Sequence, residues 1–168
     1  MKTKMLARLS LFTALALIMS LVENALPPLF AFAPGAKLGL SNLISLVALF
    51  TDGIAGGFIV LIVRIILASV FGGNFFSLIY SIPAGLISYA LQVLLVKLCI
   101  KKISIVTVSI IGGIIHNLIQ TLIASIITGV NLYSLTIYTL PAGFIAGLFV
   151  GLVAYFIIKR LPDKFFAK

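Results

Sequence analysis

Residues 23–42 read Glu23-Asn-Ala-Leu-Pro-Pro-Leu-Phe-Ala-Phe-Ala-Pro-Gly-Ala-Lys-Leu-Gly-Leu-Ser-Asn42 and interrupt a sequence that is otherwise almost uniformly apolar. The stretch holds three of the six prolines, together with Glu23 and the isolated Lys37. Proline lacks a backbone donor and breaks helices, so we expect no continuous helix here. Irregular backbone at membrane depth is tolerated only where protein buries it or water lines it. We therefore expect this stretch to cap or wall a small-molecule site.

The composition of the chain is that of an integral membrane protein. Of its 168 residues, 62% are hydrophobic and 9% are charged, whereas a soluble domain has about a quarter of its residues charged. The net charge of +9 does not indicate nucleic-acid binding, because the basic residues form short clusters between apolar runs. The sequence predicts a single polytopic membrane domain over residues 1–168.

Six apolar runs are candidates to cross the membrane, which takes about 20 helical residues. They are residues 6–22, 38–50, 54–71, 76–95, 105–127 and 133–158. The second run has 13 residues, which span only about 20 Å. It therefore needs the preceding Pro/Gly stretch to complete its crossing. We expect an all-α bundle of six transmembrane helices.

Basic residues determine the expected orientation of this bundle. Ten of the twelve lie in three clusters. The clusters are Lys2, Lys4 and Arg8, then Lys97, Lys101 and Lys102, then Lys159, Arg160, Lys164 and Lys168. With six spans all three clusters share one face, which the positive-inside rule makes cytoplasmic. We expect a multi-pass protein of the inner or cytoplasmic membrane of the cell, with both termini in the cytoplasm.

Two features of the chain restrict other interpretations. A cleaved signal peptide is the alternative for the N-terminus, but its apolar run has 17 residues, longer than the usual length of about 7 to 15. Cys99 is the only cysteine and His116 the only histidine. An intramolecular disulfide and a cysteine/histidine metal site are therefore both excluded. We expect neither a metal nor another cofactor.

Polar side chains within the spans are the candidate functional residues, because placing each one in hydrocarbon costs a few kcal/mol. Arg64 and Gln120 each lie seven residues from the outer end of their span, or about 10 Å deep. His116 and Asn117 neighbour Gln120 on one helix surface. The ligand contacts that we expect are Glu23, Lys37, Asn42, Arg64, His116, Asn117 and Gln120.

Together these residues predict a polar cavity that opens to the outside. Its expected surround is apolar and aromatic, formed by Phe30, Phe32, Phe75, Phe76 and Tyr80. The alternative is an interhelical hydrogen-bond network that binds nothing. An arginine in low dielectric binds a planar oxyanion through paired hydrogen bonds. The expected ligand is therefore a small amphipathic molecule that carries a carboxylate, phosphate or diphosphate.

Small residues at four-residue spacing predict two surfaces for close helix packing. The first span has Ser10 and Ala14, and the sixth has Gly143, Gly147 and Gly151. Either ridge could pack within the bundle or dock a partner membrane protein. We take both ridges as candidate docking surfaces.

Several of these segments resemble the Gx transporter family, commonly labelled heptaprenyl diphosphate synthase component I. The resemblance rests on Pro34-Gly-Ala-Lys-Leu-Gly-Leu-Ser-Asn42, Arg64 in Ile-Val-Arg-Ile-Ile-Leu, the Gly72-Gly73 turn, the run from Ser109 to Gln120, and Tyr138-Thr-Leu-Pro141. It covers nearly the whole chain. One departure is Pro83, where a small residue is expected. The family is similar to the substrate-binding S components of energy-coupling factor (ECF) transporters.

The likeness to S components implies a transport function. An S component has six spans, an outward ligand cavity under the loop that joins its first two helices, and small residues on its first helix that meet a coupling subunit. Separate ATPase subunits hydrolyse ATP, and this chain has no Walker A motif. The resemblance thus implies a non-catalytic subunit that binds a small molecule and works with a coupling subunit and ATPases.

The family label implies a different function, in isoprenoid or quinone biosynthesis with a soluble prenyltransferase as partner. A prenyl diphosphate synthase needs aspartate-rich motifs that hold magnesium against the substrate diphosphate. The two aspartates of this chain, Asp52 and Asp163, are isolated. The label therefore implies an accessory membrane subunit without a catalytic site of its own. Both functions remain open at the level of sequence.

Overall fold

The computed structural model describes residues 2–25, 39–99, 102–162 and 165. Within these ranges the regular elements are all helical, which confirms the expected all-α class. They are α1 (Lys2–Ala25), α2 (Leu40–Thr51), α3 (Gly53–Phe71), the 3₁₀ turn η1 (Phe75–Ser77), α4 (Leu78–Cys99), α5 (Ile105–Thr128) and α6 (Leu132–Arg160). Each of the six α-helices overlaps one of the apolar runs in the sequence.

Five of the described helical segments are long and apolar enough to cross a membrane: α1, α3, η1 with α4, α5 and α6. The exception is α2, whose 12 residues rise only about 18 Å. Nine residues of α2 are buried, because α1, α3 and α6 pack around it. Since protein rather than lipid surrounds α2, its length does not have to match the hydrocarbon thickness.

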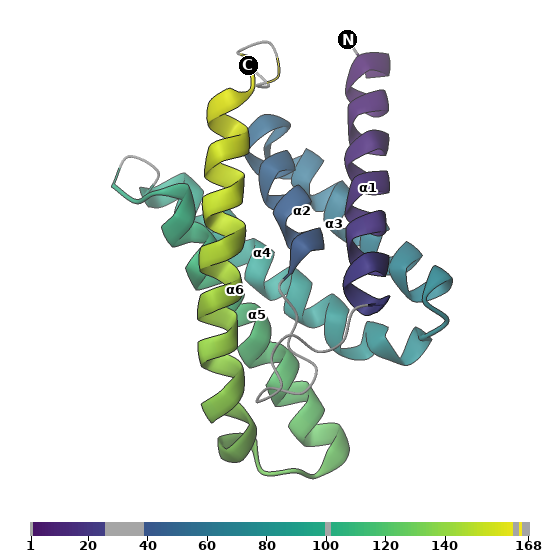
Figure 1. Ribbon diagram of the computed structural model, residues 1–168, viewed down its shortest axis with the longest axis vertical. Helices are drawn as coiled ribbons and strands as arrows, with labels where there is room; N and C mark the ends of the chain where they lie inside the picture. Colours follow the sequence, from purple (N-terminus) through teal and green to yellow (C-terminus); the bar gives the residue numbers. More distant parts are fainter. Residues whose placement is uncertain (1, 26–38, 100–101, 163–164, 166–168) are drawn as a thin grey trace.

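The helices pack as two groups of three (Figure 1). In the first group α1, α2 and α3 contact one another, and in the second α5 contacts both α4 and α6. Contacts of α2 with α6 and of α3 with α4 join the groups. Fully buried side chains include Leu46 on α2, Val60 on α3 and Val108 on α5. The space between the two groups is where the cavity lies.

Glycines let α5 and α6 approach closely. Gly143, Gly147 and Gly151 are buried in α6 and face α5. A Cβ atom on Gly147 would lie 2.7 Å from the Cα atom of Ile110 and 2.8 Å from the carbonyl oxygen of Ser109. The glycine ridge therefore packs within the bundle, as small residues commonly do between membrane helices. The expectation that Gly143, Gly147 and Gly151 dock a partner is wrong, because α5 already covers them.

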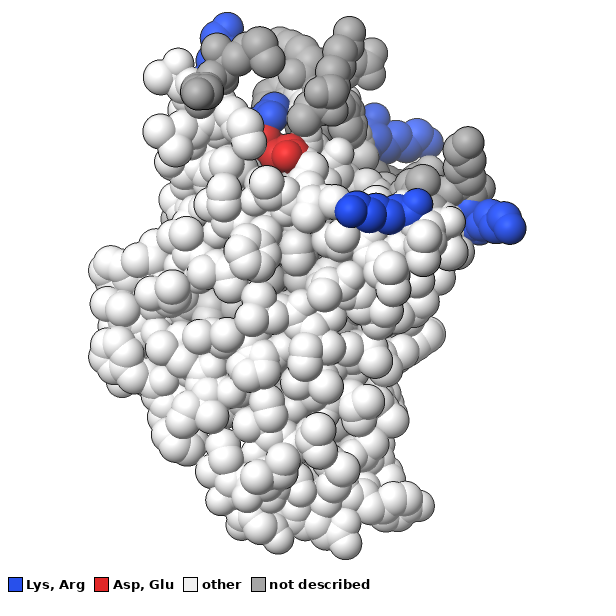
Figure 2. All heavy atoms as spheres, turned by 180° about the vertical axis from the view of Figure 1, so that it is seen from behind, with Lys and Arg blue, Asp and Glu red and all other residues white. Residues whose placement is uncertain are grey.

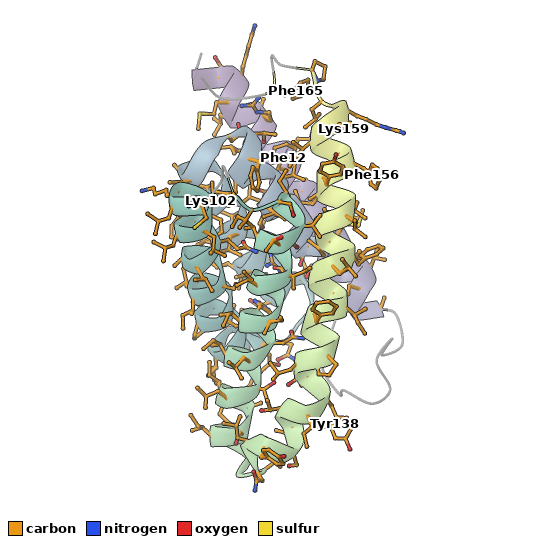
Figure 3. All side chains as sticks on the ribbon, turned by 90° about the vertical axis from the view of Figure 1, so that its left-hand side faces the viewer. Phe12, Lys102, Tyr138, Phe156, Lys159 and Phe165 are labelled. Atoms are coloured by element: carbon orange, nitrogen blue, oxygen red, sulfur yellow. The ribbon has the colours of Figure 1, made fainter. Side chains whose placement is uncertain are left out.

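Basic side chains gather at one end of the molecule (Figure 2). Lys102, before α5, and Lys159, in the last turn of α6, lie toward this end, and Tyr138 lies at the opposite end (Figure 3). The start of α1 and the end of α6 also lie at the basic end (Figure 1). This distribution is the one that the six-run topology predicts.

An ion pair between Arg8 and Asp52 stabilises the packing at the basic end. Nε of Arg8 donates to Oδ1 of Asp52 at 2.7 Å, and the side chain of Asp52 is fully inaccessible to solvent. Thr51 donates its hydroxyl to the other carboxylate oxygen at 2.9 Å. Nη1 of Arg8 donates to the carbonyl of Phe165 at 2.8 Å. Arg8 therefore links α1 to the α2–α3 turn and to the end of the chain, so Asp52 is not isolated in the fold.

Single-cysteine variants test the membrane topology. In a Cys99→Ser background, Lys102→Cys and Val130→Cys place thiols at opposite ends of α5. We expect an impermeant maleimide to label them from opposite faces of the membrane, because α5 is long and apolar enough to span it. Labelling is compared in right-side-out and inverted vesicles. Reaction of both thiols from the same face would rule out α5 as a span.

Candidate binding cavity

A cavity of about 640 Å³ lies between the two helix groups and is lined by all six α-helices. Its volume is in the range of small-molecule sites, about 300–1,000 Å³. Along α5 the lining extends from Ser109 to Ala124, which is about 22 Å of helix. Among the described lining residues only Leu61, Ile65 and Val150 have large aliphatic side chains. The cavity therefore presents many hydrogen-bonding side chains beside its apolar surface.

The described ends of residues 23–42 lie at this cavity. Glu23 is buried, and its Oε1 accepts a hydrogen bond from the backbone N–H of Gly39 at 2.6 Å. Gly39 has a φ of 75°, a conformation that glycine adopts at no steric cost. The carbonyl of Gly39 in turn accepts from the N–H of Asn42 at 2.8 Å at the start of α2. These bonds connect the end of α1 to the start of α2.

Part of the expected site lies outside the described residues. Residues 26–38 contain Lys37, Phe30 and Phe32, so their expected roles stay predictions.

Arg64 is buried in the cavity wall in the second half of α3. Its Nη1 donates to Oγ of Ser41 at 2.6 Å, and its Nη2 donates to Oδ1 of Asn42. Glu23 interacts with it electrostatically. Nε of Arg64 is buried and has no hydrogen-bond partner among the described residues. The guanidinium is therefore held by α2 while one of its donors stays unused.

The α5 residues His116, Asn117 and Gln120 all line the cavity, but they do not share the same partners. Nδ1 of His116 lies 3.5 Å from Oγ of Ser88 on α4. The amide of Asn117 donates to the carbonyl of Thr139 on α6 at 3.2 Å. The side chain of Gln120 has no hydrogen bond to another described residue. Asn117 thus contributes to packing between α5 and α6, whereas the amide of Gln120 is available to a ligand.

The expected aromatic surround is only partly present. Tyr80 lines the cavity, but Phe75 and Phe76 do not. They lie on η1 and are 62% and 56% exposed. For these two residues the prediction is wrong, because the short turn before α4 directs them outward rather than into the bundle.

Sequence reasoning missed a polar stripe on α4. Ser81, Gly85, Ser88 and Gln92 all line the cavity, at spacings of four, three and four residues. This spacing places them on one face of a helix. The pattern is visible in the sequence, but serine and glycine are common in membrane helices and each is a weak signal alone. Ser41 on α2 was missed for the same reason.

The fold and the cavity define a class of protein: a helical membrane protein of several spans with a polar chamber between its helices. The family model described as heptaprenyl diphosphate synthase component I matches residues 12–158. The chain belongs to this family, and every described residue of the cavity lies within the matched range. Comparison with curated proteins and comparison with solved structures gave no match.

Proposed function

We propose that this chain is the membrane-embedded binding subunit of an ECF-type transporter and takes a small organic anion into the cavity. The main observation behind the proposal is that Arg64 is a buried cation in the cavity wall and that its Nε donor has no partner among the described residues. A buried charge is costly unless it is paired. Ser41 and Asn42 orient the guanidinium without neutralising it. A bound carboxylate, phosphate or diphosphate would supply both the counter-charge and a partner for Nε.

The presence of Glu23 near Arg64 leaves a role for a bound anion. It is the one carboxylate among the described lining residues, and it already accepts a short hydrogen bond from the backbone of Gly39. Its electrostatic interaction with Arg64 offsets part of the positive charge. The proposed ligand approaches Arg64 from the cavity, where Gln120 offers an amide that has no partner in the described part of the chain.

The transport complex that we propose has its docking surface on α1. Ser10 and Ala14 are both exposed on this helix, so a partner helix can reach them. Small residues at this spacing permit close approach of a second helix. In the proposed topology all six α-helices cross the membrane with both termini in the cytoplasm, and separate ATPase subunits supply the energy. The basic end of the bundle is then the cytoplasmic end.

Ala14→Leu tests the docking surface. We expect it to abolish complex formation with a coupling subunit and ATPases, because the added bulk prevents close helix approach. The matched control is Ala90→Leu, which makes the same change at an exposed position of α4. The measurement is co-purification of the subunits from membranes. Complexes at the wild-type yield from the Ala14→Leu protein would show that docking does not use this face of α1.

The family name favours a second function, that of an accessory membrane subunit of heptaprenyl diphosphate synthase. In this function a soluble prenyltransferase would bind magnesium and diphosphate, since Asp52 is engaged by Arg8 and Glu23 by Gly39. The cavity would then hold an isoprenoid diphosphate. Co-purification separates the two functions: ATPases and a coupling subunit support transport, and a soluble prenyltransferase supports the accessory role.

The identity of the bound molecule tests the proposal itself. Mass spectrometry of small molecules released from the purified protein is expected to detect an organic anion. A bound organic cation would overturn the proposal, because Arg64 could not pair with it.

A further inference from the structure

The cavity extends toward the basic end from the level of His116. Ser88 on α4 and His116 on α5 both line it, and their side chains lie 3.5 Å apart, so they mark a common level. Four residues farther toward the basic end, Gln92 and Gly112 line the cavity on the same two helices, about 6 Å deeper. Ser109 lies about 10 Å below His116 along α5. We call the part of the cavity formed by Gln92, Ser109 and Gly112 the deep chamber.

The deep chamber offers hydrogen-bonding groups that carry no charge. A Cβ atom on Gly112 would collide with the side-chain amide of Gln92, so the absence of a side chain there makes room for the amide. Ser109 is 2% exposed, yet neither it nor Gln92 has a side-chain hydrogen bond to another described residue. Tyr89 differs, because its hydroxyl donates to the carbonyl of Ile54 at 2.7 Å. The chamber therefore has an amide and a hydroxyl available to a ligand.

These groups restrict what can fill the chamber. A buried polar group without a partner costs about 1–3 kcal/mol, so an alkyl or prenyl chain against Gln92 and Ser109 would be disfavoured. A ligand that carries hydroxyl or amide groups would satisfy both residues. The described lining contains only three large aliphatic side chains, Leu61, Ile65 and Val150.

We infer that the deep chamber is a second subsite, which binds an uncharged hydroxyl or amide group of the ligand whose anionic group pairs with Arg64. The substrate is then a polar organic anion that also carries a hydrogen-bonding group, which lies about one helical turn, or 6 Å, beyond the level of His116. This inference rests on the proposed function, since it takes Arg64 as the anion-binding group. It excludes an isoprenoid as the main substrate.

Two probes with the same charge and chain length test this subsite. Sorbitol 6-phosphate and hexyl phosphate share a phosphate and a six-carbon chain, and they differ in the hydroxyl groups along it. Binding of each is measured by calorimetry with the purified protein, with empty micelles as the blank. We expect sorbitol 6-phosphate to bind about tenfold more tightly or better, because its hydroxyls bond to chamber groups that hexyl phosphate covers and leaves unpaired.

Variants of the chamber show where the preference arises. Gln92→Leu and the nearly isosteric Ser109→Ala are each expected to reduce the preference at least threefold, whereas Arg64→Lys should weaken both probes alike. Leu94→Ala is the control on α4, since Leu94 is 50% exposed and does not line the cavity. Size-exclusion profiles confirm that each variant is folded, and Ser109→Ala keeps the test informative if Gln92→Leu does not fold.

The other possible outcomes contradict either the deep subsite alone or the deep subsite together with the anion site. Equal or tighter binding of hexyl phosphate that still depends on Arg64 would overturn the deep subsite and leave the anion site in place. A preference for sorbitol 6-phosphate that persists in both chamber variants would also overturn it. Binding of neither phosphate would overturn the proposed anion site together with the deep subsite.

Discussion

Replacing Gly147 with valine is expected to leave little or no folded protein. Atoms of the α5 backbone occupy the space that the new side chain would need, at 2.7 Å and 2.8 Å from its Cβ position. Backbone atoms cannot yield as the end of a flexible side chain can, so the two helices would have to separate. Overpacking usually costs about 1–3 kcal/mol and occasionally more. We expect the upper part of this range or beyond, because the branched valine adds two further methyl groups.

The measurement for Gly147→Val is the yield of monodisperse protein by size-exclusion chromatography, together with its unfolding temperature. Ile145→Val is the matched control, because it ends in the same residue on the same helix at a position that is 46% exposed. We expect the control to behave like the wild type. Wild-type stability of Gly147→Val would contradict the α5–α6 contact and make the glycine ridge available again as a docking surface.

Arg64→Lys is expected to weaken ligand binding at least about tenfold while the protein stays folded. Lysine keeps the charge but cannot reproduce the planar fork of a guanidinium. The variant loses the paired bonds to Ser41 and Asn42, and it loses the Nε donor that is unused in the described structure. An oxyanion that accepts two parallel hydrogen bonds from the guanidinium loses the most affinity from this change.

Arg8→Lys is the matched control for this experiment. Arg8 makes its paired contacts at the basic end, with Asp52 and the carbonyl of Phe165, and it does not line the cavity. Equilibrium binding of the identified ligand is expected to be unchanged in Arg8→Lys. Wild-type affinity in Arg64→Lys would instead assign Arg64 to an interhelical hydrogen-bond network.

Much of the fold can be predicted from hydropathy alone. The run at residues 105–127 corresponds to α5, Ile105–Thr128, because apolar length is what a membrane span requires. Hydropathy placed the start of the first run at residue 6, whereas α1 begins at Lys2. A helix can continue past the apolar core into a polar surrounding, so hydropathy underestimates its length there. The enclosure of α2 depends on tertiary packing that the sequence does not display.

The sequence predicts those residues of the candidate site whose burial in the membrane costs the most free energy. Arg64 stands out in a membrane helix for this reason, and Asn42 follows from its position at the start of an apolar run. Ser109 and Gln92 gave a weaker signal, because small or neutral polar residues are tolerated in such helices. The glycine ridge shows a second limit: a close helix contact requires the same small residues inside a bundle and at a partner interface.

The measurement that tests the central claim most directly is mass spectrometry of small molecules retained by purified wild-type, Arg64→Lys and Arg8→Lys proteins. The central claim is that Arg64 binds an organic anion in the cavity. The account predicts an organic anion that is retained by the wild type and by Arg8→Lys and is depleted from Arg64→Lys. Retention of the same molecule in equal amounts by all three proteins, or of an organic cation, would contradict it.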